Sequence, residues 1–158
     1  MISGAAQLYV RPMNMDPKIE IWNLLHDGEF TAIEGEQSTT LRMFVSIAYL
    51  RKRLKPLGDS FVLTLTGLKR LEWHNFDGSV SSFREELDIG TPEILKTDSQ
   101  TLPVTIETTM GSLILEFDAI RFNLDTGEEV SFETIVRVCE EYWTEWERKA
   151  EQGRGHVR

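Results

Sequence analysis

The sequence predicts an α+β fold, in which a mostly antiparallel sheet of about six strands is packed by a short N-terminal helix and a long amphipathic C-terminal helix. Three regions that differ in the spacing of their apolar residues predict this order. The spacing is helical near the N-terminus, alternating from about residue 29 to residue 124, and helical again after residue 131. A strongly curved or barrel-like sheet is one form that the strands could take.

The first helix is predicted from its start signals. Asp16 can cap the helix, and Pro17 suits the first helical position because its missing N–H would have no partner there. Three apolar residues then fall on one face before Gly28 ends the turn: Ile21, Trp22 and Leu25. We therefore predict a helix from about Pro17 to His26.

The strands are predicted from alternating apolar and polar residues between turn residues. The segments with this pattern are 29–36, 41–50, 61–73, 93–97, 102–109 and 112–124. The basic stretch RKRLK at 51–55 is interpreted as a solvated connection. Ser82, followed by Glu85 at the capping-box spacing, predicts one short helical turn between the strands.

Two irregularities interrupt the longest predicted strands. Gly67 lies inside the segment 61–73 and indicates either a bulge or the end of a strand. In the segment 112–124 the apolar residues change parity between Phe117 and Ile120. Such a change means either a bulge or a strand that leaves one packing layer for another, because each face of a strand carries every second residue.

The last helix is predicted from an apolar stripe that follows a capping residue, Ser131. The stripe recurs at spacings of three and four residues: Phe132, Ile135, Val136, Cys139, Tyr142, Trp143 and Trp146. A strand over 130–138 is the alternative, since β-branched residues also alternate there. The helix is favoured because residues 140–151 cannot alternate and one helix unites both parts.

Length and composition fit one packed unit. With 158 residues, 41% of them apolar, we expect a single domain over residues 16–152, a poorly ordered extension over 1–15 and a flexible tail over 153–158. The chain lacks a signal-peptide pattern and any apolar run of the roughly 18 residues that would span a membrane. The single cysteine, Cys139, is interpreted as buried, and a cytoplasmic location without a membrane partner is predicted.

The charge argues against a general nucleic-acid binder, because such proteins need clustered cations. The chain has 17 basic and 26 acidic residues, for a net charge of −9. The whole excess lies in residues 80–158, since residues 1–79 are neutral. This acidic half, together with its tryptophans, is chemically suited to a basic protein partner.

No catalytic, cofactor-binding or metal-binding residue is predicted, because the chain has no phosphate-binding loop, nucleophile elbow or sufficient set of histidines. His26-Asp27 is interpreted as a helix end and its turn. The hypothesis of an enzyme or small-ligand binder rests on polar residues that share strand faces and could line a cleft between sheet and last helix. These residues are Glu72, His74, Glu107, Glu116 and Asp118.

Three segments carry a resemblance to a known group of proteins: LLHDGEF at 24–30, FVLTLTGLKRLEW at 61–73 and GSLILEFDAIRF at 111–122. Over about residues 20 to 124 the chain resembles small bacterial domains of unknown function, in which a Leu-His-Asp segment opens an antiparallel sheet. Some of those domains occur among immunity proteins that neutralise toxins. The resemblance implies binding without chemistry, and it assigns no functional residue.

The leading hypothesis is therefore a non-catalytic protein-interaction module, possessing an acidic, tryptophan-containing surface on the last helix. The candidate partner-binding residues are Glu140, Glu141, Trp143, Glu145 and Trp146. A homodimer through the tryptophans is a further possibility.

Overall fold

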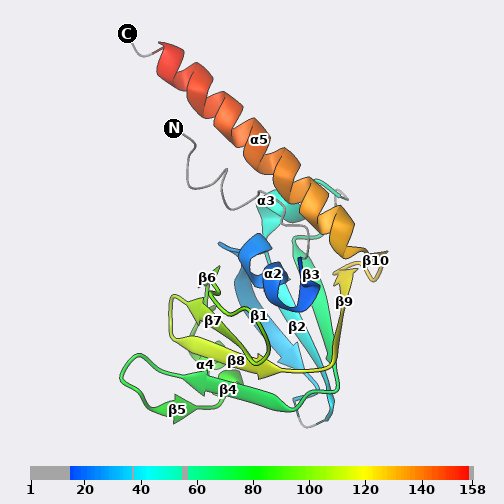
Figure 1. The fold of residues 1–158 in the computed structure, drawn as a ribbon, viewed down its shortest axis with the longest axis vertical. Coiled ribbons are helices and arrows are strands. Elements are labelled where there is room, and N and C mark those ends of the chain that lie inside the picture. The colour runs from blue at the N-terminus through cyan, green and yellow to red at the C-terminus, as the bar shows by residue number, and fades with distance from the viewer. Residues whose placement is uncertain (1–14, 37, 55–56, 157–158) are drawn as a thin grey trace.

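The computed structural model describes residues 15–36, 38–54 and 57–156, and its fold is of the predicted α+β class (Figure 1). Ten strands form two antiparallel sheets of five, which we call sheet A and sheet B. The helices of the described residues are α2 (Pro17–Leu24), α3 (Ala48–Arg51), α4 (Phe83–Ile89) and α5 (Phe132–His156).

The two sheets are distinct, and they do not close into a barrel. In spatial order, sheet A contains β1 (Glu29–Glu34), β2 (Thr40–Ser46), β3 (Ser60–Thr66), β9 (Ala119–Leu124) and β10 (Glu129–Val130). Sheet B contains β5 (Val80–Ser81), β4 (Arg70–His74), β8 (Ser112–Glu116), β7 (Val104–Thr108) and β6 (Ile94–Lys96). A single bridge between Glu29 and Glu93 connects β1 to the segment before β6.

Two neighbouring strands pass from one sheet to the other at a shared corner. There the backbone N–H of Lys69 donates to the carbonyl of Glu116 at 2.8 Å, and that of Asp118 donates to the carbonyl of Thr66 at 2.9 Å. Gly67 has a φ of +67°, and a Cβ at this position would lie 2.2 Å from a carboxylate oxygen of Asp118. Both irregularities in the sequence therefore mark this corner, and splitting the two long segments there raises the strand number above the expected six.

The predicted strand over 41–50 is wrong after Ser46, where β2 ends and the chain turns into α3. Leu50 and Arg51 are both fully buried. Their N–H groups donate to the carbonyl of Ile47 at 3.2 and 3.0 Å, so the backbone here closes a helical turn instead of pairing with a neighbouring strand.

The prediction of a solvated loop at 51–55 is also wrong at Arg51. Its guanidinium pairs with Asp125 at 2.9 Å and donates to the carbonyl oxygens of Leu57 at 2.7 Å and Ser60 at 3.2 Å. A buried charge is tolerated only when it is paired and hydrogen-bonded in this way. Arg51 therefore joins the chain after α3 to the β9–β10 turn.

A row of aromatic side chains crosses the core between the sheets. Trp22 of α2 lies 6.2 Å from Phe30 of β1, and Phe83 of α4 lies 5.4 Å from both Phe30 and Trp73 of β4, measured between ring centroids. The predicted Ser82 cap is present, since its hydroxyl accepts from the N–H of Glu85. Phe83 thus holds the short helix α4 against both sheets, and Leu87 of the same helix packs partly buried against the core.

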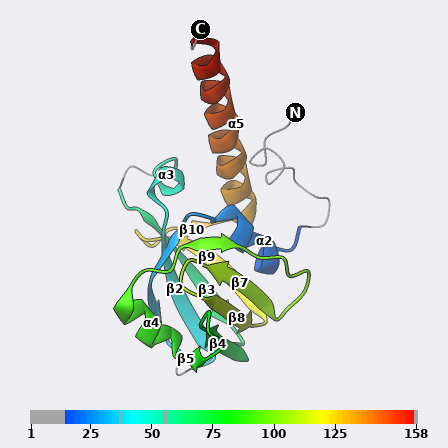
Figure 2. The same ribbon diagram turned by 90° about the vertical axis from the view of Figure 1, so that its left-hand side faces the viewer.

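Helix α5 begins at Phe132, as the apolar stripe predicts, and the strand alternative is limited to β10, which ends at Val130. Ser131 caps the helix by accepting from the N–H of Thr134 at 3.1 Å. The first two turns bury five side chains: Phe132, Ile135, Val136, Val138 and Cys139. The rest of the helix projects beyond the two sheets and runs on to His156, past the boundary expected at residue 152 (Figures 1 and 2).

No helix in the described part of the chain is both long and apolar enough to cross a membrane. Of the extension expected over residues 1–15, only Met15 is described, and its side chain packs partly buried against the core. The remainder of that extension lies outside the described residues, as do residues 157–158 of the expected tail.

Candidate functional site

The point where α5 leaves the sheets is held by four aromatic rings, which we call the aromatic junction: His26, Tyr49, Tyr142 and Trp143. The rings of Tyr49 and Tyr142 have centroids 4.5 Å apart, and Trp143 stacks on His26 at 5.3 Å. The Tyr49 hydroxyl donates to the carbonyl of His26 at 3.1 Å. Burial raises the pKa of Tyr49, so it remains a neutral hydrogen-bond donor.

Arg53 strengthens the junction from the end of α3. Its guanidinium lies 5.2 Å from the centroid of the Tyr142 ring, a cation–π distance, and it forms an ion pair with Glu145. The hydrogen bond from Arg53 holds the pKa of Glu145 below its ordinary value. Arg53 therefore contacts α5 at two residues, Tyr142 and Glu145, which lie about one helical turn apart.

The glutamates predicted to bind a partner differ in their surroundings. Glu145 is engaged by Arg53, and Glu141 pairs with Arg137 of the same helix at 3.3 Å. Glu140 is half-buried. Two of the three predicted acidic contacts thus already have a basic neighbour, which lowers the negative charge that this part of α5 offers to a partner.

The two predicted tryptophans also have different roles. Trp143 belongs to the aromatic junction, where it packs against rings from two other helices or their ends. Trp146 lies one turn further on, 46% exposed, with its ring centroid 5.6 Å from that of Trp143. Trp146 is therefore the aromatic residue of the predicted surface that is available to a partner.

The residues of the alternative polar site are only partly brought together. Glu72 and His74 lie on the outer face of β4, with Glu72 Oε1 3.1 Å from His74 Nε2. Arg70 forms an ion pair with Glu72 and faces Glu116 across the β4–β8 register. Hydrogen bonds from Arg70 and then His74 lower the pKa of Glu72 to about 2, so this carboxylate is a poor general base at neutral pH.

The other two members of that set lie elsewhere. Glu107 on β7 is 3.8 Å from Lys96 Nζ, and Asp118 at the sheet corner pairs with Lys69 at 2.8 Å. No group of three or more His, Cys, Asp or Glu side chains within the described ranges could hold a metal ion. The enzyme or small-ligand hypothesis stays a prediction without a shared site for all five residues.

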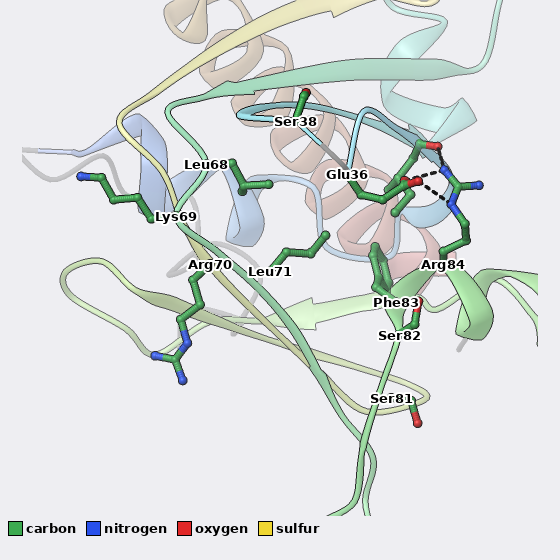
Figure 3. Close-up of a pocket in the computed structure, with 11 residues that line it drawn as sticks. Glu36, Ser38, Leu68, Lys69, Arg70, Leu71, Ser81, Ser82, Phe83 and Arg84 are labelled. Atoms are coloured by element: carbon green, nitrogen blue, oxygen red, sulfur yellow. Dashed lines mark hydrogen bonds and ion pairs between the residues drawn. The ribbon is translucent and has the colours of Figure 1, made fainter.

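A hollow of about 440 Å³ lies beside the sheet corner, between the β1–β2 connection and α4 (Figure 3). Ile33, Leu68, Leu71 and Phe83 supply its apolar lining. Its polar wall is an ion pair in which Arg84 Nε donates to Glu36 Oε1 at 2.8 Å, while Lys69 and Arg70 at the rim point away from it.

This hollow offers packing surface rather than acid–base chemistry. Arg84 also donates to the carbonyl of Ile33 at 2.8 Å, and its hydrogen bond to Glu36 lowers the pKa of that carboxyl. A carboxylate held ionised by a guanidinium is a weak proton acceptor. None of the five residues of the predicted polar site lines this hollow.

Tyr49 and Arg53 are the contributors to the junction that sequence reasoning missed. Tyr49 lay in a segment predicted as a strand, and Arg53 in one predicted as a solvated loop. Their spacing of four residues is the one signal that could have revealed them, because a helical turn places such residues on the same side. Both then contact Tyr142.

Comparison of the chain with protein-family models, with curated proteins and with solved structures finds no match. The resemblance to small bacterial domains therefore stays a prediction. What the protein does has to be inferred from its own surfaces, and the projecting half of α5 is the region that the sequence and the geometry both single out.

Proposed function

We propose that this protein is a non-catalytic interaction module that binds a basic protein partner through the projecting half of α5. The observation that carries the proposal is Trp146, a large aromatic side chain on a helical segment that extends beyond the sheets (Figure 2). Tryptophan is enriched among the residues that dominate binding energy at protein interfaces. The aromatic junction supports its use by holding the base of this segment in place.

The preference for a basic partner rests on charge. Helix α5 carries six glutamates against four basic residues, and the whole acidic excess of the chain lies in residues 80–158. Opposite charges on two proteins accelerate their encounter and disfavour partners of like charge. The pairing of Glu141 and Glu145 with arginines makes this contribution moderate, so we assign most of the binding energy to Trp146.

The resemblance noted in the sequence supplies the class of partner to test first. If the chain is a bacterial immunity-like domain, its partner is a basic protein toxin, and binding would suffice to block that toxin. The buried Cys139 supports a reducing compartment such as the cytoplasm, since the thiol has no disulfide partner there.

The proposal is tested by capture with matched variants. Immobilised wild-type chain, Trp146→Ser and Leu95→Ser are exposed at low salt to a lysate of the source cells, and bound proteins are quantified by mass spectrometry. Leu95 on β6 is 47% exposed, against 46% for Trp146, so it controls for the loss of an exposed apolar side chain. We expect a basic protein to bind wild type and Leu95→Ser, and to be lost with Trp146→Ser.

The captured protein is then purified and its Kd measured with each chain. A partner that binds Trp146→Ser as tightly as wild type would contradict the proposal. Sedimentation equilibrium tests the homodimer: if wild type dimerises and Trp146→Ser does not, the helix serves self-association and the basic-partner proposal is wrong.

A further inference from the structure

We propose a second interaction surface, at the end of sheet B opposite to α5, which binds a basic amphipathic segment of a partner protein. We call it the hairpin-tip patch. It comprises Phe76 in the turn of the β4–β5 hairpin, Ile89 at the end of α4 and the partly buried Met110 in the β7–β8 turn.

Three segments that are far apart in the sequence converge there. The β7–β8 turn lies against the end of β4, because a Cβ added to Gly111 would be 2.6 Å from the carbonyl oxygen of His74. The end of α4 lies against the same turn, because a Cβ added to Gly90 would be 3.4 Å from Met110 Sδ. Figures 1 and 2 show α4 and the β4–β5 hairpin at the end of the molecule away from α5.

Two of the apolar side chains of this patch are more exposed than Trp146. Phe76 is 76% exposed and Ile89 75%, whereas Met110 packs partly buried beneath them. Single exposed apolar residues are common, but several large ones at one end of a protein mark an interaction site.

The hairpin that carries Phe76 is held by its own hydrogen bonds. The N–H of Asn75 donates to the carbonyl of Ser79 at 2.8 Å, and its side-chain amide donates to Ser81 Oγ at 2.7 Å. Asp77 Oδ1 accepts from both the N–H and the hydroxyl of Ser79 at 2.9 and 2.6 Å. A fixed turn loses less conformational entropy on binding than a loose one, so Phe76 is pre-organised for a partner.

Acidic side chains on the same two segments define the chemistry of the partner. Asp77 lies at the hairpin tip, and α4 contributes Glu85, Glu86 and Asp88. The one cation of α4, Arg84, is held by Glu36 on the opposite side of that helix's start. An apolar patch with acidic neighbours fits a segment that has apolar residues on one side and Lys or Arg around them, and it repels an anionic lipid surface.

The test uses a synthetic amphipathic helix of leucine and lysine, titrated into isotope-labelled protein and followed by NMR. We expect saturable shifts at Phe76, Ile89 and Met110, which weaken as salt is raised. The double variant Phe76→Ser, Ile89→Ser should bind the peptide at least about tenfold more weakly, the equivalent of roughly 1.4 kcal/mol. Leu57→Ser is the matched control, since Leu57 is 74% exposed in the α3–β3 connection, and it should bind like wild type.

Four results would overturn the inference. They are equal binding of wild type and the double variant, equal binding of a peptide with glutamate in place of lysine, concentration-dependent shifts of the patch without peptide, and shifts of the patch caused by anionic lipid vesicles. Unchanged spectra outside the patch show that the double variant is folded. Because Trp146→Ser leaves this patch intact, its effect tests the proposed function separately.

Discussion

The two halves of helix α5 share one apolar stripe but have opposite environments. The first half, from Phe132 to Cys139, buries its stripe against the sheets, whereas the second half carries the exposed Trp146 beyond them. The stripe has the same spacing in both halves, so the spacing determines the helix and its side but not what covers it. Where an amphipathic helix extends beyond the core of its own protein, only another molecule can cover its apolar face.

The largest expected difference between the halves is in thiol accessibility. Cys139 is fully buried, and burial raises the pKa of its thiol to about 12. It should therefore react with an aromatic disulfide reagent only when the protein unfolds, about a thousandfold or more slowly than an exposed thiol at a typical stability of 5 kcal/mol or more. The variant Trp146→Cys should add one thiol that reacts at once. Rapid reaction of Cys139 in the wild type would show that the base of α5 opens locally.

Truncating a single side chain in the buried half of α5 should strongly destabilise the fold. Ile135→Ala is expected to lower the free energy of unfolding by about 2 to 5 kcal/mol, because it removes apolar contacts and leaves a cavity. Urea denaturation followed by tryptophan fluorescence measures the change. Thr144→Ala, at an exposed position of the same helix, is the control and should change stability little. A similar small effect for Ile135→Ala would mean that α5 is not needed for the core.

The aromatic junction should give an intermediate effect. Trp143→Ala removes a half-buried ring that packs on His26 and Tyr142, so we expect a loss of about 2 kcal/mol, less than for a fully buried tryptophan. The same urea titration measures it. Hydrogen exchange should show faster opening of the projecting half than of residues 132–139. If both halves opened equally, the junction would not be the boundary between them.

Removing the exposed tryptophan should hardly change stability. Trp146→Ser is expected to alter the free energy of unfolding by less than about 0.5 kcal/mol, since the side chain gains little from folding. Thermal unfolding with and without an identified partner distinguishes a role of Trp146 in the stability of the fold from a role in binding the partner. A large loss of stability without partner would place Trp146 in the fold rather than in an interface.

The smallest expected effect is a response to acid at the base of the projecting half. The pKa of Glu145 is lowered by Arg53, so their interaction stabilises the folded state above the ordinary carboxyl pKa and is lost as the pH falls through the lowered value. Carbon-detected NMR of the Glu145 carboxyl should show its midpoint rise in Arg53→Gln. Arg121→Gln, which breaks a different exposed pair with Glu129, should leave that midpoint unchanged.

The sequence predicted much of the fold because its signals are local. The start of α5, the burial of Cys139 and the irregularities at Gly67 and Ile120 can each be recognised within a few residues. The helix at 48–51 could not, because the segment also alternates. The burial of Arg51 depends on Asp125, which is distant in the sequence and gives no sign of being its partner.

The candidate surfaces also combine features that local sequence signals predict with features that depend on residues distant in the sequence. The stripe predicts that Trp143 and Trp146 lie on one side of a helix, but their different exposure depends on Tyr49 and His26, which other elements position. The hairpin-tip patch could not be predicted at all, since Phe76, Ile89 and Met110 come together only after the strands pair.

The shared corner of the two sheets also determines when the protein can fold during synthesis. Phe61 of β3 pairs with Leu124 of β9, and His74 of β4 pairs with Ser112 of β8, so both sheets need segments that leave the ribosome much later than their partners. Pairing between distant segments is slow because a long loop must close first. Sheet B cannot be completed before residue 116 has been made, nor sheet A before residue 130, and α5 follows directly. A nascent chain therefore acquires the core of the two sheets and the projecting helix almost together.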